Sequence, residues 1–289
     1  MEPIKKRAAI LNILGNILLF IVKVIIGFLY NSIVIISDAL NSLVDIVSSG
    51  IIYLSVKVSS ESADKEHPFG HKRAEPIAAL IVAVLTFVVG FEIIRIAFER
   101  LVTKTISEFG IIPLIVLVAV IIIKLIMYLY SISVGTKTKS TAILASAIDN
   151  RNDIAVSVVA IIGFAGSHLG MIFLEPSAAM LIGLWIIISG FSIGINNLKF
   201  LMGEAPKKDL LEKIKNAASK VEGVKGIHDV KAHYVGTLVQ VEVHISVDRN
   251  LTIYRAHTLG KKVEKEVEKL QEVEKAFVHI DPIIKLKPH

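Results

Sequence analysis

The chain has 289 residues and no cysteine, 53% of its positions are hydrophobic, and its formal net charge at pH 7 is +6. Soluble domains contain about 45–50% apolar and about 25% charged residues, whereas only 20% of this chain is charged. The charges are also unevenly spread, with 30 among residues 1–206 and 28 among the last 83. This distribution excludes a single soluble domain, a disordered chain and a disulfide scaffold, and it predicts a membrane domain followed by a small soluble one.

Six apolar segments are long enough to cross a bilayer as helices, which takes about 20 residues. They cover residues 10–29, 33–57, 75–98, 111–134, 141–165 and 177–199. Lys and Arg lie before the first segment, after the last one, and in the connections 58–74 and 135–140; on the opposite side only the 99–110 turn is basic. Because cytoplasmic loops are enriched in Lys and Arg, both termini are predicted to be cytoplasmic. We therefore expect a six-helix transmembrane transport domain over residues 1–206, and the basic charge is a topology signal that does not predict nucleic-acid binding.

Residues 207–289 predict a cytoplasmic α+β domain of ferredoxin-like type with the element order αββαβ. Residues 207–221 and 252–270 have the charged amphipathic pattern of helices, and residues 227–235, 238–247 and 274–281 have the pattern of strands. Gly236 and Thr237 form the predicted hairpin turn, and two helices are expected to cover one side of a three-stranded sheet. Because a domain of this size has a thin core, we expect dimerisation to support it.

Charged side chains inside membrane spans are costly, so each one is a functional hypothesis. In the second span, Asp38, Asn41 and Asp45 are spaced i, i+3, i+7 and share a helix face; in the fifth span, Asp149 and Asp153 are one turn apart. Two helices that present oxygen ligands at i and i+4 can close on one cation. The predicted ligands are the amide oxygen of Asn41 and the carboxylates of Asp45, Asp149 and Asp153.

This ligand set contains only oxygen, which suits Mn²⁺, Mg²⁺ or Ca²⁺ better than Zn²⁺, although carboxylates also bind Zn²⁺ and Fe²⁺. Without a cation, three converging carboxylates repel one another and take up protons, so the site is suited to exchanging a divalent ion for protons. The alternative is that these groups line a water-filled crevice or pair with Arg151 and Lys124. For Lys124, near the middle of the fourth span, the sequence suggests no role beyond a carboxylate partner. Asn12 and Asn16, one turn apart in the first span, are expected to form interhelical hydrogen bonds.

At these residues the chain resembles the cation diffusion facilitator family of divalent-metal/proton antiporters. The similarity includes the six spans, the run from Ser37 to Asp45, the loop from His67 to Glu75 and the αββαβ tail. The resemblance implies a transport site at one i, i+4 pair in the second span and one in the fifth, which are the four ligands named above. Zinc-transporting members usually carry a histidine there, and the Asn-x-x-x-Asp and Asp-x-x-x-Asp pairs are similar to the manganese-exporting branch.

The resemblance also implies two further metal sites outside the spans. The loop site falls on Asp64, His67 and His71. The cytoplasmic site falls on His228, His244, His279 and Asp281, with His257 as an extra ligand from the second tail helix or across the dimer. Strand alternation predicts that His233 is a surface residue on the face opposite His228. The alternative for the loop is that Pro68-Phe69-Gly70 shapes a turn while the two histidines form hydrogen bonds. The alternative for the cytoplasmic site is that the strand histidines are structural residues that bind no metal.

Together these features predict a homodimeric exporter in the cell (inner or plasma) membrane that works by alternating access and is not an enzyme. It binds Mn²⁺ from the cytoplasm and releases it outside as protons take the carboxylates, and it uses a divalent metal both as transported ion and as cytoplasmic ligand. The closest alternative is an exporter of Zn²⁺, Fe²⁺ or Co²⁺. Two alternatives belong to other functional classes. One is an intramembrane aspartyl enzyme, although the chain lacks the Gly-x-Gly-Asp motif of such enzymes. The other is a membrane-bound metal sensor or scaffold.

Overall fold

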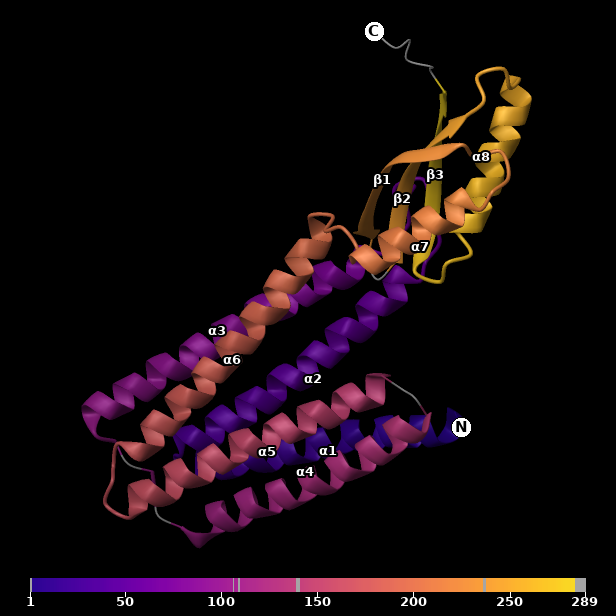
Figure 1. The fold of residues 1–289 in the computed structure, drawn as a ribbon. Coiled ribbons are helices and arrows are strands. Elements are labelled where there is room, and N and C mark those ends of the chain that lie inside the picture. Colours follow the sequence, from indigo (N-terminus) through magenta and orange to yellow (C-terminus); the bar gives the residue numbers. More distant parts are fainter. Residues whose placement is uncertain (1, 106, 109, 139–140, 236–237, 284–289) are drawn as a thin grey trace. The chain divides into compact units, whose positions relative to one another are not determined.

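The computed structural model describes residues 2–105, 107–108, 110–138, 141–235 and 238–283 (Figure 1). The long helices are α1 (Glu2–Leu29), α2 (Ile33–Ser59), α3 (Ala74–Thr103), α4 (Ile111–Thr138), α5 (Thr141–His168) and α6 (Leu174–Leu201). They coincide with the six predicted spans, and each is longer than predicted at one or both ends. The predicted fold class, a polytopic helical membrane protein with a small α+β domain, is confirmed.

Helix α5 differs in composition from the other long helices. Within the described residues, α1 to α4 and α6 are long and apolar enough to cross a membrane, and α5 does not meet that criterion. The reason is its polar centre, which carries Asp149, Arg151 and Asp153 within five residues. The least apolar of the six helices is therefore one of the two that carry predicted ligands.

The chain packs into two compact units. The first contains residues 1–52 and 81–194, which are α1, α4, α5 and most of α2, α3 and α6. The second contains residues 53–80 and 195–289, which are the remaining ends of α2, α3 and α6, the loop between α2 and α3, and the tail. The boundaries between the two packing units thus fall within α2, α3 and α6, whereas the domain boundary predicted from composition falls at residue 206.

Close helix packing holds the first unit together. A Cβ atom on Gly183 of α6 would lie 2.9 Å from the carbonyl oxygen of Gly90 on α3, so these two helices meet backbone to backbone, as small residues allow in membranes. The buried carboxylate of Glu175, in the first turn of α6, accepts hydrogen bonds from Ser32 (2.6 Å) and Ser107 (2.5 Å). These bonds tie the start of α6 to the α1–α2 turn and the α3–α4 connection.

The tail forms the predicted three-stranded sheet. Strand β1 (Gly226–Val235) pairs antiparallel with β2 (Leu238–Val247), and β2 pairs parallel with β3 (Val273–Pro282). Helices α7 (Lys208–Ser219) and α8 (Ile253–Val267) cover one face (Figure 1), where β2 buries alternate apolar side chains from Val239 to Val247. The other face of β2 carries Gln240, Glu242, His244 and Ser246. The order αββαβ is confirmed, and the predicted turn at residues 236–237 lies outside the described residues.

Candidate metal centres

The structure brings the polar face of α2 against that of α5. The amide nitrogen Nδ2 of Asn41 donates a hydrogen bond to Oδ1 of Asp153 at 3.1 Å. Asp153 is buried, Asp45 is half-buried and Asp149 is exposed, and both of the latter lie within electrostatic range of Asp153. All four predicted ligands therefore belong to one polar region, with Asn41 and Asp153 in direct contact. Asn41 presents its nitrogen here, so its oxygen becomes a ligand only after the amide rotates.

The second oxygen of Asp153 is held by Lys124 of α4. The Lys124 ammonium contacts Asp153 Oδ2 and also donates to Asn16 Oδ1 at 2.7 Å. Asn12 donates to Ser131 at 2.9 Å, so the expected interhelical hydrogen bonds of both α1 asparagines are confirmed. The carboxylate partner suggested for Lys124 is Asp153, one of the predicted ligands.

Asp38, on the same face of α2, belongs to a separate ion pair. Its Oδ1 accepts from the Lys23 ammonium at 2.8 Å and its Oδ2 from Ser157 at 3.0 Å. Lys23 also donates to Ser42 at 3.2 Å, and the side chains of Lys23 and Asp38 are both fully buried. This closed pair joins α1, α2 and α5 next to the predicted ligands without including any of them.

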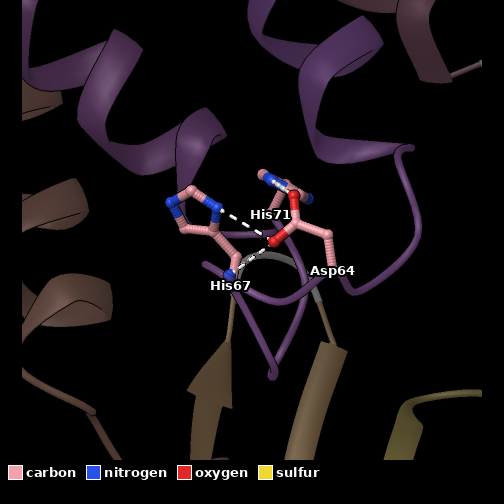
Figure 2. A group of neighbouring side chains, drawn as sticks. All are labelled: Asp64, His67 and His71. Carbon is pink, nitrogen blue, oxygen red and sulfur yellow. Dashed lines mark hydrogen bonds and ion pairs between the residues drawn. The ribbon is translucent and has the colours of Figure 1, made fainter.

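The loop between α2 and α3 brings Asp64, His67 and His71 together, as Figure 2 shows. His67 Nδ1 lies 3.4 Å from Asp64 Oδ1, and His71 Nε2 lies 3.4 Å from Asp64 Oδ2. The turn that allows this runs through Gly70, whose φ of +79° is the left-handed conformation that glycine adopts without strain. One carboxylate thus stands between two imidazoles, an arrangement that can hold a divalent cation.

Electrostatics keep the Asp64 carboxylate charged. The backbone N–H groups of His67 (2.5 Å) and Glu66 (2.9 Å) both donate to its Oδ1. The hydrogen bond from the His67 backbone, followed by the one from Glu66, lowers the pKa of Asp64 below its ordinary value. The Nδ1 atom of His71 is buried and has no hydrogen-bond partner among the described residues.

The tail brings together the second predicted cluster on the polar face of the sheet. Asp281 Oδ2 lies 2.9 Å from His228 Nε2 and 3.4 Å from His244 Nδ1, and Asp281 Oδ1 lies 3.3 Å from His279 Nε2. The rings of His244 and His279, which are paired across β2 and β3, have centroids 4.6 Å apart. The hydrogen bond from His228, together with the nearby His279 and His244, lowers the pKa of Asp281. Asp281 is therefore the ionised centre of three imidazoles.

A β-bulge brings His228 into this cluster. The register of β1 and β2 shifts between the pairs Ile227–Ile245 and Asp229–His244, so His228 is the extra residue. Its ring then lies on the polar face, 6.1 Å from the His244 ring. His233 pairs with Gln240 and lies on the same face. The prediction that His228 and His233 face opposite ways was wrong, because regular alternation does not allow for a bulge.

His257 does not join the cluster within the described chain. It is an exposed residue of α8 and has no ion pair or ring contact with the histidines of the sheet among the described residues. The physical reason is that α8 packs on the apolar face of the sheet, while the cluster lies on the polar face. Within one chain His257 thus lies apart from the cluster, and its role as an extra ligand stays a prediction.

Comparison with known proteins agrees with this architecture. Residues 9–202 match the cation efflux transmembrane domain, and residues 206–283 match the cytoplasmic domain of cation efflux proteins. The two matches together cover nearly the whole chain. The chain also shows 27% identity over 276 residues to the cation-efflux pump FieF of Cronobacter sakazakii, covering 96% of this chain and 92% of that protein.

Two other relatives align over almost their full lengths. An uncharacterized transporter of Methanocaldococcus jannaschii is 36% identical over 276 residues, which is 96% of this chain and 98% of that protein. The manganese efflux system protein MneS of Bacillus subtilis is 30% identical over 284 residues, which is 98% of each chain. The chain therefore belongs to the cation efflux family, the cation diffusion facilitators, which are membrane transporters of divalent metal cations.

Proposed function

We propose that the protein exports Mn²⁺ in exchange for protons, through a site formed by α2 and α5. The observation that carries the proposal is the contact between Asn41 and Asp153, which joins the two helices that bear the all-oxygen ligand set. Oxygen ligands without sulfur or imidazole favour hard divalent ions such as Mn²⁺. The similarity to a manganese efflux protein supports the same ion.

The proposed exchange follows from the charges of the site. Asp45, Asp149 and Asp153 repel one another when they are all ionised, and either one divalent cation or added protons relieve that repulsion. With the site open to the cytoplasm, the ionised carboxylates bind the metal, and Asn41 rotates its amide oxygen toward it. With the site open to the other side, protons compete for the carboxylates and release the metal.

The tail is proposed to bind a divalent cation in a regulatory or structural role, and to hold two copies together. The support for the cation site is the cluster of His228, His244 and His279 around Asp281. Imidazole nitrogen suits Zn²⁺ and other transition metals, so this cation need not be the cargo. The support for a homodimer is the thin core of so small a domain. We propose His257 as an extra ligand that reaches the cluster of the second copy across that dimer.

We also propose that both termini are cytoplasmic and that the membrane is the plasma membrane, which the distribution of Lys and Arg between the loops supports.

The test is metal-driven proton flux in proteoliposomes that contain the full-length protein. Asp153→Ala is expected to abolish Mn²⁺-dependent proton movement because it removes the most buried carboxylate of the site. Asn152→Ala, one residue earlier on α5 and outside the ligand set, is the matched control and is expected to transport. Equal flux by wild type and Asp153→Ala would refute the site.

The choice of ion is tested by competition among Mn²⁺, Zn²⁺, Fe²⁺ and Co²⁺ in the same vesicles. Asn41→His replaces an amide ligand with imidazole and is expected to shift the preference toward Zn²⁺. An unchanged order of ions would show that selectivity is determined elsewhere. If wild type prefers Zn²⁺, Fe²⁺ or Co²⁺, the proposal of a metal exporter stands, but the preferred ion replaces Mn²⁺ as the proposed cargo.

A further inference from the structure

Lys124 is a buried ammonium near the middle of α4. It is 1% exposed, and together with Lys23 it is among the largest fully buried side chains of the described chain. An ammonium has three N–H donors and no acceptor, and its burial is tolerated only when it is paired. Lys124 has three acceptors: Asp153 Oδ2, which is its closest contact, Asn16 Oδ1 at 2.7 Å and Asn150 Oδ1 at 3.4 Å.

The carboxylate that Lys124 contacts is engaged at both oxygens. Oδ2 of Asp153 accepts from Lys124, while Oδ1 accepts from Asn41 Nδ2 at 3.1 Å. A divalent cation that binds Asp153 needs one of these oxygens. A metal ion and an ammonium bound to the same carboxylate are close enough to repel each other strongly. Cation binding at Asp153 and the Lys124 contact therefore compete.

The surrounding amides offer the ammonium a second position. Asn150 donates its own Nδ2 to Asn12 Oδ1 at 2.8 Å, and Asn12 donates to Ser131 at 2.9 Å. This chain of hydrogen bonds between α1, α4 and α5 orients the Asn150 oxygen toward Lys124. An ammonium that leaves Asp153 keeps the oxygens of Asn150 and Asn16 as acceptors, so displacement leaves it partly solvated by amides instead of unpaired.

We propose that Lys124 is a resident cation of the transport site, which neutralises Asp153 until a divalent ion displaces its ammonium toward the amides of α1 and α5. The inference rests on the proposed function, since Asp153 is one of the proposed ligands. It assigns Lys124 two effects on transport. It weakens ion binding, which favours release on the far side. It also disfavours monovalent cations, because such an ion brings no more charge to Asp153 than the ammonium that it replaces.

Lys23 offers the matched comparison. It is equally buried and paired with a carboxylate, but its partner Asp38 is outside the proposed ligand set and has its second oxygen bonded to Ser157. Removing either lysine deletes a buried positive charge from the same helical unit. Only removal of Lys124 frees an oxygen on a proposed metal ligand.

The experiment measures Mn²⁺ transport by full-length protein in proteoliposomes, as KM and Vmax, with and without excess Na⁺. Lys124→Gln is expected to lower KM about tenfold or more, to lower Vmax because release slows, and to make transport sensitive to Na⁺. Lys23→Gln is expected to change KM and Na⁺ sensitivity less than Lys124→Gln does, because Lys23 forms its ion pair with Asp38 and contacts no proposed ligand. A KM for Lys124→Gln that is equal to or higher than that of wild type overturns the proposal.

A second variant keeps the test decisive if Lys124→Gln does not fold or transport. Asn16→Ala retains the Lys124–Asp153 pair but removes an acceptor for the displaced ammonium, so it is expected to raise KM. In the Lys124→Gln background, where that variant is active, the same change is expected to have no effect on KM, a coupling that a double-mutant cycle measures. An Asn16→Ala protein with wild-type KM overturns the proposal.

The site assignment and the role of Lys124 fail in different ways. If Asp153→Asn transports Mn²⁺ like wild type, the proposed site is wrong and the inference is overturned with it. If Asp153→Asn is inactive while Lys124→Gln and Asn16→Ala both keep the wild-type KM, the site stands and only the role of Lys124 is refuted.

Discussion

Replacing Asp281 by Asn is expected to abolish tight metal binding by the tail. Ligand atoms that lie about 2.1 Å from a tetrahedral metal ion are about 3.4 Å apart. The three distances between Asp281 oxygens and imidazole nitrogens are 2.9, 3.4 and 3.3 Å. Each is within about half an ångström of that separation, and one ligand atom each of His228, His244 and Asp281 lie within 4.8 Å of one another. These three residues can therefore accept an ion with small side-chain movements, whereas His279 contacts only the other oxygen of Asp281. Asp281 is the residue common to all three contacts.

The expected size of the effect follows from what the substitution removes. Loss of an outer-shell partner of a metal ligand typically costs about 10–100-fold in affinity, and Asp281 is itself a proposed ligand with a negative charge. We therefore expect the Kd of the tail site to rise at least about a hundredfold.

The assay is a Co²⁺ titration of the full-length protein in detergent, followed by visible absorption. A background with both Asp64→Asn and Asp153→Ala removes the contributions of Asp64, His67 and His71 in the loop and of the proposed transport site. His233→Ala is the matched control, since His233 lies on the same sheet face and pairs with Gln240 outside the cluster. Unchanged Co²⁺ binding by the Asp281→Asn protein, or an equal loss in the control, would refute the reasoning.

Three further predictions concern stability. Lys23→Met leaves Asp38 buried without its partner and is expected to lower the free energy of unfolding by about 3–5 kcal/mol, measured by thermal unfolding in detergent. The double variant Lys23→Met/Asp38→Leu should recover much of that loss, and a single variant as stable as wild type would contradict the argument. Gly183→Ala drives a methyl group to 2.9 Å from the α3 backbone and should destabilise by about 1–3 kcal/mol, whereas Gly50→Ala, with nothing within 4 Å, should not. The pKa of Asp64 is lowered in the folded loop from its ordinary 3.8, so the ionised carboxylate stabilises the loop fully above that pH, and this stabilisation is lost as the pH falls through the folded pKa. Amide-exchange protection of the loop should therefore fall over that pH range in wild type and be low at every pH in Asp64→Ala.

The sequence predicted the elements of this protein well, because two simple regularities specify them. Apolar runs longer than about 20 residues specify membrane helices, and all six spans were found even though α5 carries charges at its centre. Alternating residues and charged amphipathic stretches specified the αββαβ tail. The helical period also indicates which polar side chains share a face, so it specifies the i, i+4 pairs on α2 and α5 without knowledge of the contact between the two helices.

Contacts between elements were less accessible to such reasoning. Lys124 and Asp153 are 29 residues apart in sequence, and Asn16 is 108 residues from Lys124. No local period links them, and the sequence suggested only a carboxylate partner for the lysine. His228 illustrates another limit, since one inserted residue reverses the direction of its side chain and only the paired strand reveals the insertion.

The uneven distribution of charge determined by itself that the chain has a membrane part and a soluble part, because charges are excluded from bilayers at a high energetic cost. It also determined which few polar residues in the spans deserve a functional explanation. Only the tertiary structure decided how those residues pair: Asp38 with Lys23, and Asp153 with Lys124 and Asn41. The reason is physical, since a buried charge must find a partner of opposite sign, and the packing of the helices decides which one lies within reach.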